Sequence, residues 1–394
     1  MSALEEEVGT GQAEPDDRFR SELRGWLGEH LTAEVRHAVM DRESDTAFAI
    51  LRQWNAELYD AGYAAVGWPA VHGGRDASLL DQLAFNEEMA RAGAPGPVNA
   101  IGVANIAPAI MALGADEQQV RFLRPLLRGD KIWSQGMSEP DAGSDLAALR
   151  TRAVLDGDHF VVDGQKTWNS MGHRADWCQL YVRTDPDAPR HRGITCLLVD
   201  MRTPGIHAKP IVTMAGGTDF SEVFFDAVRV PVSSVLGEVN GGWQVATSTL
   251  GYERAGVASL YLSLRAKCDR LLAAARKPRA DGTSAWDDPV KRDRLMVRYI
   301  QVRNLELLAK RTLGSALRSA APGPEGSVIK LAWSTTDQAL QRTAVDVLGM
   351  EALDGPWAEG LLGSCSLTIA GGTTEVNKNI IGERVLGLPR EPKP

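Results

Sequence analysis

Residues 131–149, KIWSQGMSEPDAGSDLAAL, lie where the character of the sequence changes. Before them, from Phe19 to about Leu127, apolar residues recur at the three- and four-residue spacing of amphipathic helices. After them come short runs rich in β-branched and aromatic residues, such as HFVVDGQKTW, WCQLYVRTD, ITCLLVDM and SEVFFDAVRVP. The chain is therefore predicted to pass from helices into a small antiparallel β unit.

Helical spacing returns after the turn-forming stretch GEVNGG and continues in three long runs, 243–271, 290–317 and 328–348. The sequence thus predicts an α+β fold. Its expected parts are a disordered acidic tail (1–17), an N-terminal helical domain (18–130), a middle β domain (131–240) and a C-terminal helical domain (241–394). Because the tail lacks the basic and then apolar order of a secretory signal, the cytoplasm is the expected location.

Composition excludes several classes of function. The 394 residues carry a net charge of −8, so the composition does not indicate a basic surface that binds nucleic acid or an anionic membrane. No apolar run approaches the ~20 residues that a membrane helix needs. The four cysteines contain no CxxC pair and the seven histidines show no metal-ligand spacing. We expect buried free thiols and no metal.

The segment DAGSD, residues 141–145, has two interpretations. It fits an ordinary N-cap and turn before a short helix. It also fits a loop whose backbone N–H groups and serine hydroxyl meet an anionic or heteroaromatic ligand. The chain has neither a GxGxxG after a strand nor a P-loop motif, so a nucleotide would have to be held in another way.

Four segments occur in the order found in the acyl-CoA dehydrogenase family: GMSEPDAGSD, DGQKTWNSMG, VFFDAVRVP with GEVNGGW, and IAGGTTEVNKNIIGERVLG. From about Phe19 to Leu388 the sequence therefore resembles this family. The resemblance implies a C-terminal four-helix bundle, with FAD lying between it and the β domain. It also implies α,β-dehydrogenation of an acyl-CoA thioester, with electrons passed to an electron-transfer flavoprotein.

The resemblance also implies roles for individual residues. Gln135, Met137 and Ser138 would line the flavin ring, and Ser144 would reach the pyrophosphate region and the substrate. Trp168 would cover one face of the isoalloxazine, and Ser170 would lie near its N5 atom. Thr373 and Glu375 would contact the cofactor from the last domain. Taken singly, Trp168 also fits a core aromatic and Ser170 a hydroxyl at a strand end.

The catalytic base occupies an alternative place in this sequence. In the commonest family pattern the glutamate precedes the Gly-Thr pair that is Gly372-Thr373 here, and that position is Gly371, which cannot accept a proton. A minority of the family, isovaleryl-CoA dehydrogenase among them, carries the glutamate directly before an arginine on another helix, as in GYERAG. Glu253 is thus the implied base, although it also fits a solvated helical acid. Gly371, Gly372 and Arg254 would contact the substrate.

The last domain departs from the family pattern at two places. Regions that usually hold a neighbouring subunit's FAD read DGTSAWDDPVKRDRL and VDVLGMEAL, with Asp346 and Met350 in place of a glutamine and a glycine. We therefore expect a hetero-oligomer with a related subunit, of the kind that oxidises steroid side-chain thioesters in bacteria; a homotetramer is the alternative. The alternative functions are an acyl-CoA oxidase or flavin monooxygenase of the same fold, or a non-catalytic partner subunit.

Overall fold

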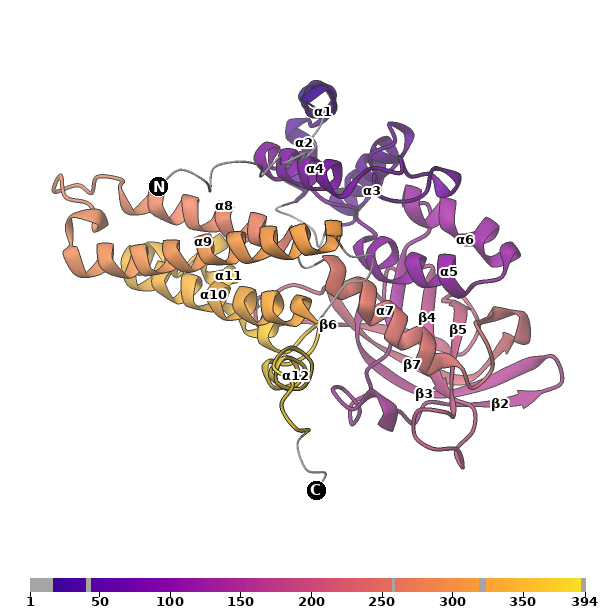
Figure 1. The fold of residues 1–394 in the computed structure, drawn as a ribbon. Helices are drawn as coiled ribbons and strands as arrows, with labels where there is room; N and C mark the ends of the chain where they lie inside the picture. Colours follow the sequence, from indigo (N-terminus) through magenta and orange to yellow (C-terminus); the bar gives the residue numbers. More distant parts are fainter. Residues whose placement is uncertain (1–16, 40–43, 257–258, 319–323, 391–394) are drawn as a thin grey trace, which may run out of the picture.

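The computed structural model describes residues 17–39, 44–256, 259–318 and 324–390, without the side chains of 251–256 and 315–318. Figure 1 shows helices at both ends of the sequence and a β sheet between them, so the predicted order of helices, strands and helices is confirmed. Within the described ranges, no helix combines the length and the apolar character needed to cross a membrane.

The N-terminal helices begin with serine or threonine caps where the sequence offers them. Thr32 and Ser44 accept hydrogen bonds from backbone N–H groups three residues later, as does Ser78. The helices are α1 (Asp17–His30), α2 (Ala33–Ala38), α3 (Asp45–Asp60), α4 (Leu79–Ala92), α5 (Ala107–Leu113) and α6 (Asp116–Arg128). Their apolar faces form one core that continues into the sheet.

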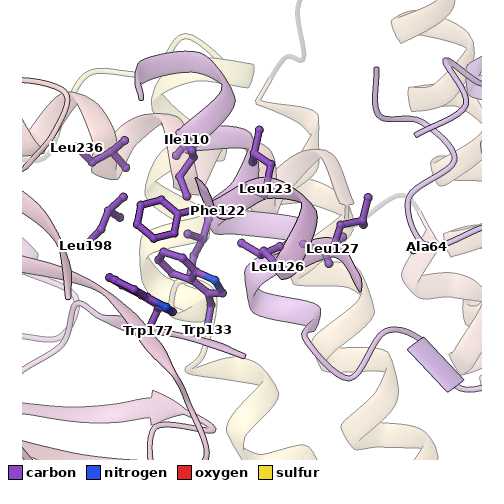
Figure 2. Packing of buried hydrophobic residues seen from close by; sticks show 14 of the residues in the cluster. Ala64, Ile110, Phe122, Leu123, Leu126, Leu127, Trp133, Trp177, Leu198 and Leu236 are labelled. Atoms are coloured by element: carbon purple, nitrogen blue, oxygen red, sulfur yellow. The ribbon is translucent and has the colours of Figure 1, made fainter. Parts of the chain in front are cut away.

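An aromatic cluster joins the N-terminal helices to the first strands. The ring centroid of Phe122 on α6 lies 5.2 Å from that of Trp133 and 4.8 Å from that of Trp177 (Figure 2). The planes of both tryptophan rings are steeply inclined to the Phe122 ring, at 88° and 65°. Edge-to-face contacts of this kind stabilise aromatic pairs beyond the area they bury. The sheet is therefore fixed firmly against α6.

A buried carboxylate ties α1 to α4. Glu88 is 1% exposed and receives hydrogen bonds from Arg20, Arg24 and Arg91 at 2.7–2.9 Å. The hydrogen bond from Arg24 and the other arginine charges outweigh the effect of burial and lower the pKa of Glu88 to about 2. The carboxylate is therefore ionised at neutral pH.

The strands form one sheet in the order β6-β7-β3-β2-β4-β5-β8, with β1 beside β4. They are β1 (Trp133–Gly136), β2 (Arg152–Asp156), β3 (His159–Ser170), β4 (Trp177–Arg183), β5 (Ile194–Asp200), β6 (Ile206–Ile211), β7 (Phe220–Pro231) and β8 (Val235–Leu236). The sheet is not wholly antiparallel as predicted, because β1 runs parallel to β4 and Arg152 of β2 pairs in parallel with Arg183. The reason is topological. The β2–β3 hairpin lies between β1 and β4 in the sequence, so a tight turn does not join these two strands and they can run in the same direction.

The C-terminal helices are α7 (Gly242–Gly256), α8 (Leu260–Ala275), α9 (Pro289–Arg318), α10 (Glu325–Leu348), α11 (Pro356–Ser364) and α12 (Thr374–Ile380). Helices α8, α9 and α10 share a core of their own. In contrast, Val245 and Ala246 of α7 belong to the core that contains Trp177 and Leu198. Figure 1 accordingly shows α7 lying across the sheet, and α7 also contacts α10 of the bundle.

Three of the cysteines are buried free thiols, as expected: Cys178, Cys196 and Cys268. The fourth, Cys365, is exposed, so the prediction was wrong there. It follows α11 at the start of a 3₁₀ turn on the outside of the bundle.

Candidate functional site

A buried ion pair fixes the loop that follows β1. Lys166 on β3 is fully buried and its Nζ lies 2.8 Å from Glu139 Oε1, while it also donates to the Met137 carbonyl at 3.1 Å. Glu139 further accepts from the backbone N–H groups of Arg150 and Thr151. Burial alone would raise the pKa of Glu139, but the charge and hydrogen bond of Lys166 lower it. The loop is thereby held against β3.

The predicted flavin-ring residues are brought together on this framework. Thr167 N donates to the Ser138 carbonyl at 2.9 Å, and a Cβ built on Gly136 would lie 3.5 Å from Asn169 Nδ2. The segment that contains Gln135, Met137 and Ser138 therefore lies directly beside the end of β3, which carries Trp168 and Ser170.

The end of β3 is strained and irregular. Trp168 and Met171 have φ of +61° and +54°, and the register with β7 shifts between Lys166 and Asn169. Trp168 is 58% exposed, and its ring stands nearly perpendicular to that of Phe220 at a centroid distance of 6.0 Å. Non-glycine residues at positive φ concentrate at functional sites. The core-aromatic interpretation of Trp168 is therefore wrong.

Asn169, between Trp168 and Ser170, is fully buried. Neither its amide oxygen nor its amide nitrogen has a hydrogen-bond partner among the described residues. Buried polar groups are nearly always satisfied, so an orphaned amide indicates a place where another group belongs. The exposed indole of Trp168 fits a site that binds a planar cofactor, while the Asn169 amide lies on the buried side of β3, near Gly136.

A cavity of about 410 Å³ opens beside Ser170, between the N-terminal helices and the sheet. One wall is apolar and includes Phe48, Leu51 and Val98, and the other carries His173, Arg174 and Asp219. Arg174 pairs with Asp45 at 2.9 Å and stacks over Phe48. Sequence reasoning missed this polar wall, although His173 and Arg174 directly follow the WNSMG motif.

The predicted base lies on the helix that packs on the sheet. α7 spans Gly242–Gly256 and therefore includes positions 253 and 254, but the side chains of Glu253 and Arg254 lie outside the described residues. One turn earlier, Thr249 is fully buried and its hydroxyl lies 3.4 Å from the Tyr181 hydroxyl on β4. Position 253 follows Thr249 by four residues and shares its face of α7.

The two predicted glycines form a tightly held turn. Gly371 and Gly372 have φ of +65° and +92°, a region that favours glycine. The Gly372 carbonyl accepts from Lys330 Nζ at 2.6 Å and from Asn377 Nδ2 at 2.8 Å. Thr373 then caps α12 by accepting from Val376 N. This arrangement fixes the turn against α10 through Lys330 and against α12 through Asn377.

The remaining predicted cofactor residues, Glu375 and Ser144, are exposed on the surface. Glu375 lies in the first turn of α12, which packs on α10. The neighbour of Ser144, Asp145, stands at the N-cap position of the following 3₁₀ turn, as the N-cap interpretation of DAGSD expects, and its carbonyl accepts from Ala148 N at 2.9 Å. Its side chain makes no capping hydrogen bond and instead accepts from Arg190 at 2.6 Å.

Comparison with known protein families gives matches over most of the chain. Models of the acyl-CoA dehydrogenase N-terminal, middle and C-terminal domains match residues 14–130, 134–228 and 240–386. The chain is 39% identical to acyl-CoA dehydrogenase IpdE1 of Mycobacterium tuberculosis, over 96% of this chain and 99% of that protein.

Two solved structures extend this similarity to the fold. The ChsE4-ChsE5 complex from Mycobacterium tuberculosis matches with a TM-score of 0.83 and 35% identity, over 95% of this chain and 97% of that chain. The Tcur3481-Tcur3483 steroid ACAD matches with a TM-score of 0.84 and 31% identity, again over 95% and 97%. The chain therefore belongs to the acyl-CoA dehydrogenase family of flavoprotein oxidoreductases.

Proposed function

We propose that this chain oxidises an acyl-CoA thioester to the trans-2-enoyl thioester, with Glu253 as the base and FAD as the cofactor. The observation that carries the proposal is the exposed, strained Trp168, which lies beside the segment containing Gln135, Met137 and Ser138 on the sheet that α7 covers. A cofactor ring and a helix-borne base would then lie on opposite sides of a substrate that enters from the cavity at Ser170.

The residues present fit a flavin. The Trp168 indole offers an exposed aromatic ring beside the segment that contains Gln135, Met137 and Ser138. Gln135, Met137, Ser138 and Ser170 would border the ring, while Ser144, Thr373 and Glu375 would contact the rest of the FAD. When bound, FAD supplies the acceptor for the hydride that leaves Cβ.

The chain itself would handle the proton. The ionised carboxylate of Glu253 takes the proton from Cα and becomes a neutral acid, while the electron pair of that C–H bond forms the double bond to Cβ. The Gly371 N–H would donate to the thioester carbonyl and stabilise the charge that develops on its oxygen. Arg254 would contact the ligand beside the base. The apolar wall of the cavity, which includes Phe48, Leu51 and Val98, would shield the acyl group from water.

The cavity has room for a bulky acyl group. About 410 Å³ lies within the range of pockets that take drug-sized ligands. One structural relative, Tcur3481-Tcur3483, is a steroid acyl-CoA dehydrogenase, and the other is the ChsE4-ChsE5 complex. We therefore propose a steroid-derived or similarly polycyclic acyl group as the substrate.

The proposed assembly is a hetero-oligomer with a related subunit, which completes a second part of the cofactor site. Asp346 is half exposed and pairs with Arg294 at 3.1 Å, and Met350 is 81% exposed. An acidic group and a bulky side chain at these positions oppose the close approach of a neighbour's phosphates. The proposed electron acceptor is an electron-transfer flavoprotein, and the cytoplasm remains the proposed location.

The test is flavin bleaching without oxygen. The FAD-loaded protein, co-purified with its related subunit where that is needed for FAD binding, should lose its flavin colour when a polycyclic acyl-CoA is added. Glu253→Gln should slow bleaching by about 10²- to 10⁴-fold, because a general base is removed. Glu359→Gln, an exposed glutamate on α11, is the matched control.

Two outcomes would overturn the proposal. Bleaching at the native rate by Glu253→Gln would show that another group takes the proton or that this chain has no turnover of its own. Rapid oxygen consumption by the reduced protein would instead identify an oxidase or monooxygenase of the same fold.

A further inference from the structure

Gln179 is a polar residue in the middle of a fully buried strand. β4 reads WCQLYVR, and its residues from Trp177 to Val182 are all buried. The Gln179 side chain itself is 0% exposed. A buried amide is tolerated only where its oxygen and nitrogen find partners. Its partners therefore explain what the glutamine does there.

The two ends of the Gln179 amide meet two different elements. Its oxygen accepts from Gln135 Nε2 at 3.1 Å, in the parallel register that sets these two residues side by side on β1 and β4. Its nitrogen lies 3.5 Å from the Thr249 hydroxyl oxygen on α7. One buried amide thus joins the strand predicted to border the flavin to the helix predicted to carry the base.

Tyr181, Gln179 and Thr249 together form a buried polar row. Tyr181 lies two residues along β4 and so presents its side chain on the same face as Gln179. Its hydroxyl is 3.4 Å from the Thr249 hydroxyl, and Tyr181 and Thr249 are both 0% exposed. Burial raises the pKa of Tyr181 well above its usual value, so the phenol stays protonated and can donate.

The row gives α7 a defined rotation about its axis. Apolar contacts, such as those of Val245 and Ala246 with the sheet, are not directional and leave a helix free to rotate slightly. A hydrogen bond to Thr249 has a required direction. Because position 253 is one turn further along the same helix face, the rotation of α7 that is set at Thr249 also sets the rotation at position 253.

We infer that Gln179 is a positioning residue: its amide fixes the Gln135 side chain on one side and, through Thr249, the rotation of α7 on the other. The inference rests on the proposed function. In this inference neither Gln179 nor Thr249 contacts the substrate. Their effect is on the distance and angle at which Glu253 meets the Cα proton.

The test compares Gln179→Leu and Thr249→Val with Thr249→Ser, which keeps the hydroxyl. Gln118→Leu is the matched control, because Gln118 is a buried glutamine whose side-chain hydrogen bonds reach the Ser233 and Val235 carbonyls and the Ala115 N–H, none of which belongs to α7. The first readout is amide hydrogen exchange of residues 242–250 in flavin-free protein. The second is the deuterium isotope effect for substrate labelled at Cα, measured on flavin reduction by the loaded protein.

Gln179→Leu and Thr249→Val should speed exchange of residues 242–250 at least ~10-fold and raise the Cα isotope effect, because proton removal becomes slower. Thr249→Ser and Gln118→Leu should leave the exchange rate and the isotope effect at native values. This should hold even if Gln118→Leu lowers the melting temperature as much as Gln179→Leu or Thr249→Val does. Native exchange and isotope effects in both Gln179→Leu and Thr249→Val would overturn the inference. If Glu253→Gln is inactive in the same assay, only the inference fails; if it is active, the proposed function fails as well.

Discussion

Trp168 combines an unfavourable backbone conformation with an aromatic side chain left outside the core. A left-handed conformation costs about 1–2 kcal/mol for a residue with a Cβ. The Lys166–Glu139 ion pair, two residues before it, provides the rigid support that such strain requires. The strain is therefore compensated inside the fold, and the exposed indole remains available for a ligand.

Glu88 gives a prediction about pH. Its folded pKa is about 2, below the ordinary value of 4.5, so its ionised form stabilises the fold above about pH 4.5 and that contribution is lost as the pH falls toward 2. The shift corresponds to about 3 kcal/mol. Glu88→Gln should lower the unfolding temperature at pH 7, because three arginines lose their carboxylate, and should flatten its fall between pH 5 and 3.

The measurement is the thermal unfolding temperature of both proteins at a series of pH values. Glu117→Gln, an exposed glutamate on α6, should behave like the native chain. The same slope between pH 5 and 3 in Glu88→Gln and the native protein would show that Glu88 does not cause this part of the acid sensitivity.

Among the elements, α7 shows where sequence patterns stop being informative. Helical spacing predicts one run from Trp243 to about Leu271, and the structure divides this run between α7 and α8. The two helices pack in different cores. Periodicity reports that a helix has an apolar face, but it does not report which surface that face meets.

α9 carries a row of exposed apolar residues at heptad spacing. Val290, Val297, Ile300 and Leu307 are 40–60% exposed and recur at intervals of seven and three residues. Such a stripe on a bundle helix indicates an interface. We predict that Ile300→Asp converts the assembled protein to a species near the 42.6 kDa monomer mass and lowers its bound FAD.

Light scattering during gel filtration measures that mass, and absorbance at the flavin maximum measures the FAD per chain. Val120→Asp places the same charge at an 81% exposed valine on α6 and should leave both values unchanged. An unaltered mass in Ile300→Asp would mean that the stripe is not an interface.

At the scale of the whole molecule, the α+β fold followed from the change of period near residue 131 and from the motif order. The cavity did not, because Phe48, Val98 and Ser170 come from three distant parts of the chain and meet only after long-range packing. The buried Gln179 was missed for the same reason. The roles of Glu253, Trp168 and Ser170 came from motif resemblance, since spacing alone also fits a solvated acid, a core aromatic and a strand-end hydroxyl.

The central claim is that a carboxylate on α7 removes the Cα proton, and hydrogen exchange at Cα measures this step directly. An acyl-CoA with sulfur in place of Cβ can lose its α-proton but has no hydride to give, so it isolates the step from flavin reduction. In D₂O the native protein should place deuterium at Cα of this analogue, as seen by mass spectrometry, and Glu253→Gln should not. Equal deuterium incorporation by the two proteins would contradict the account.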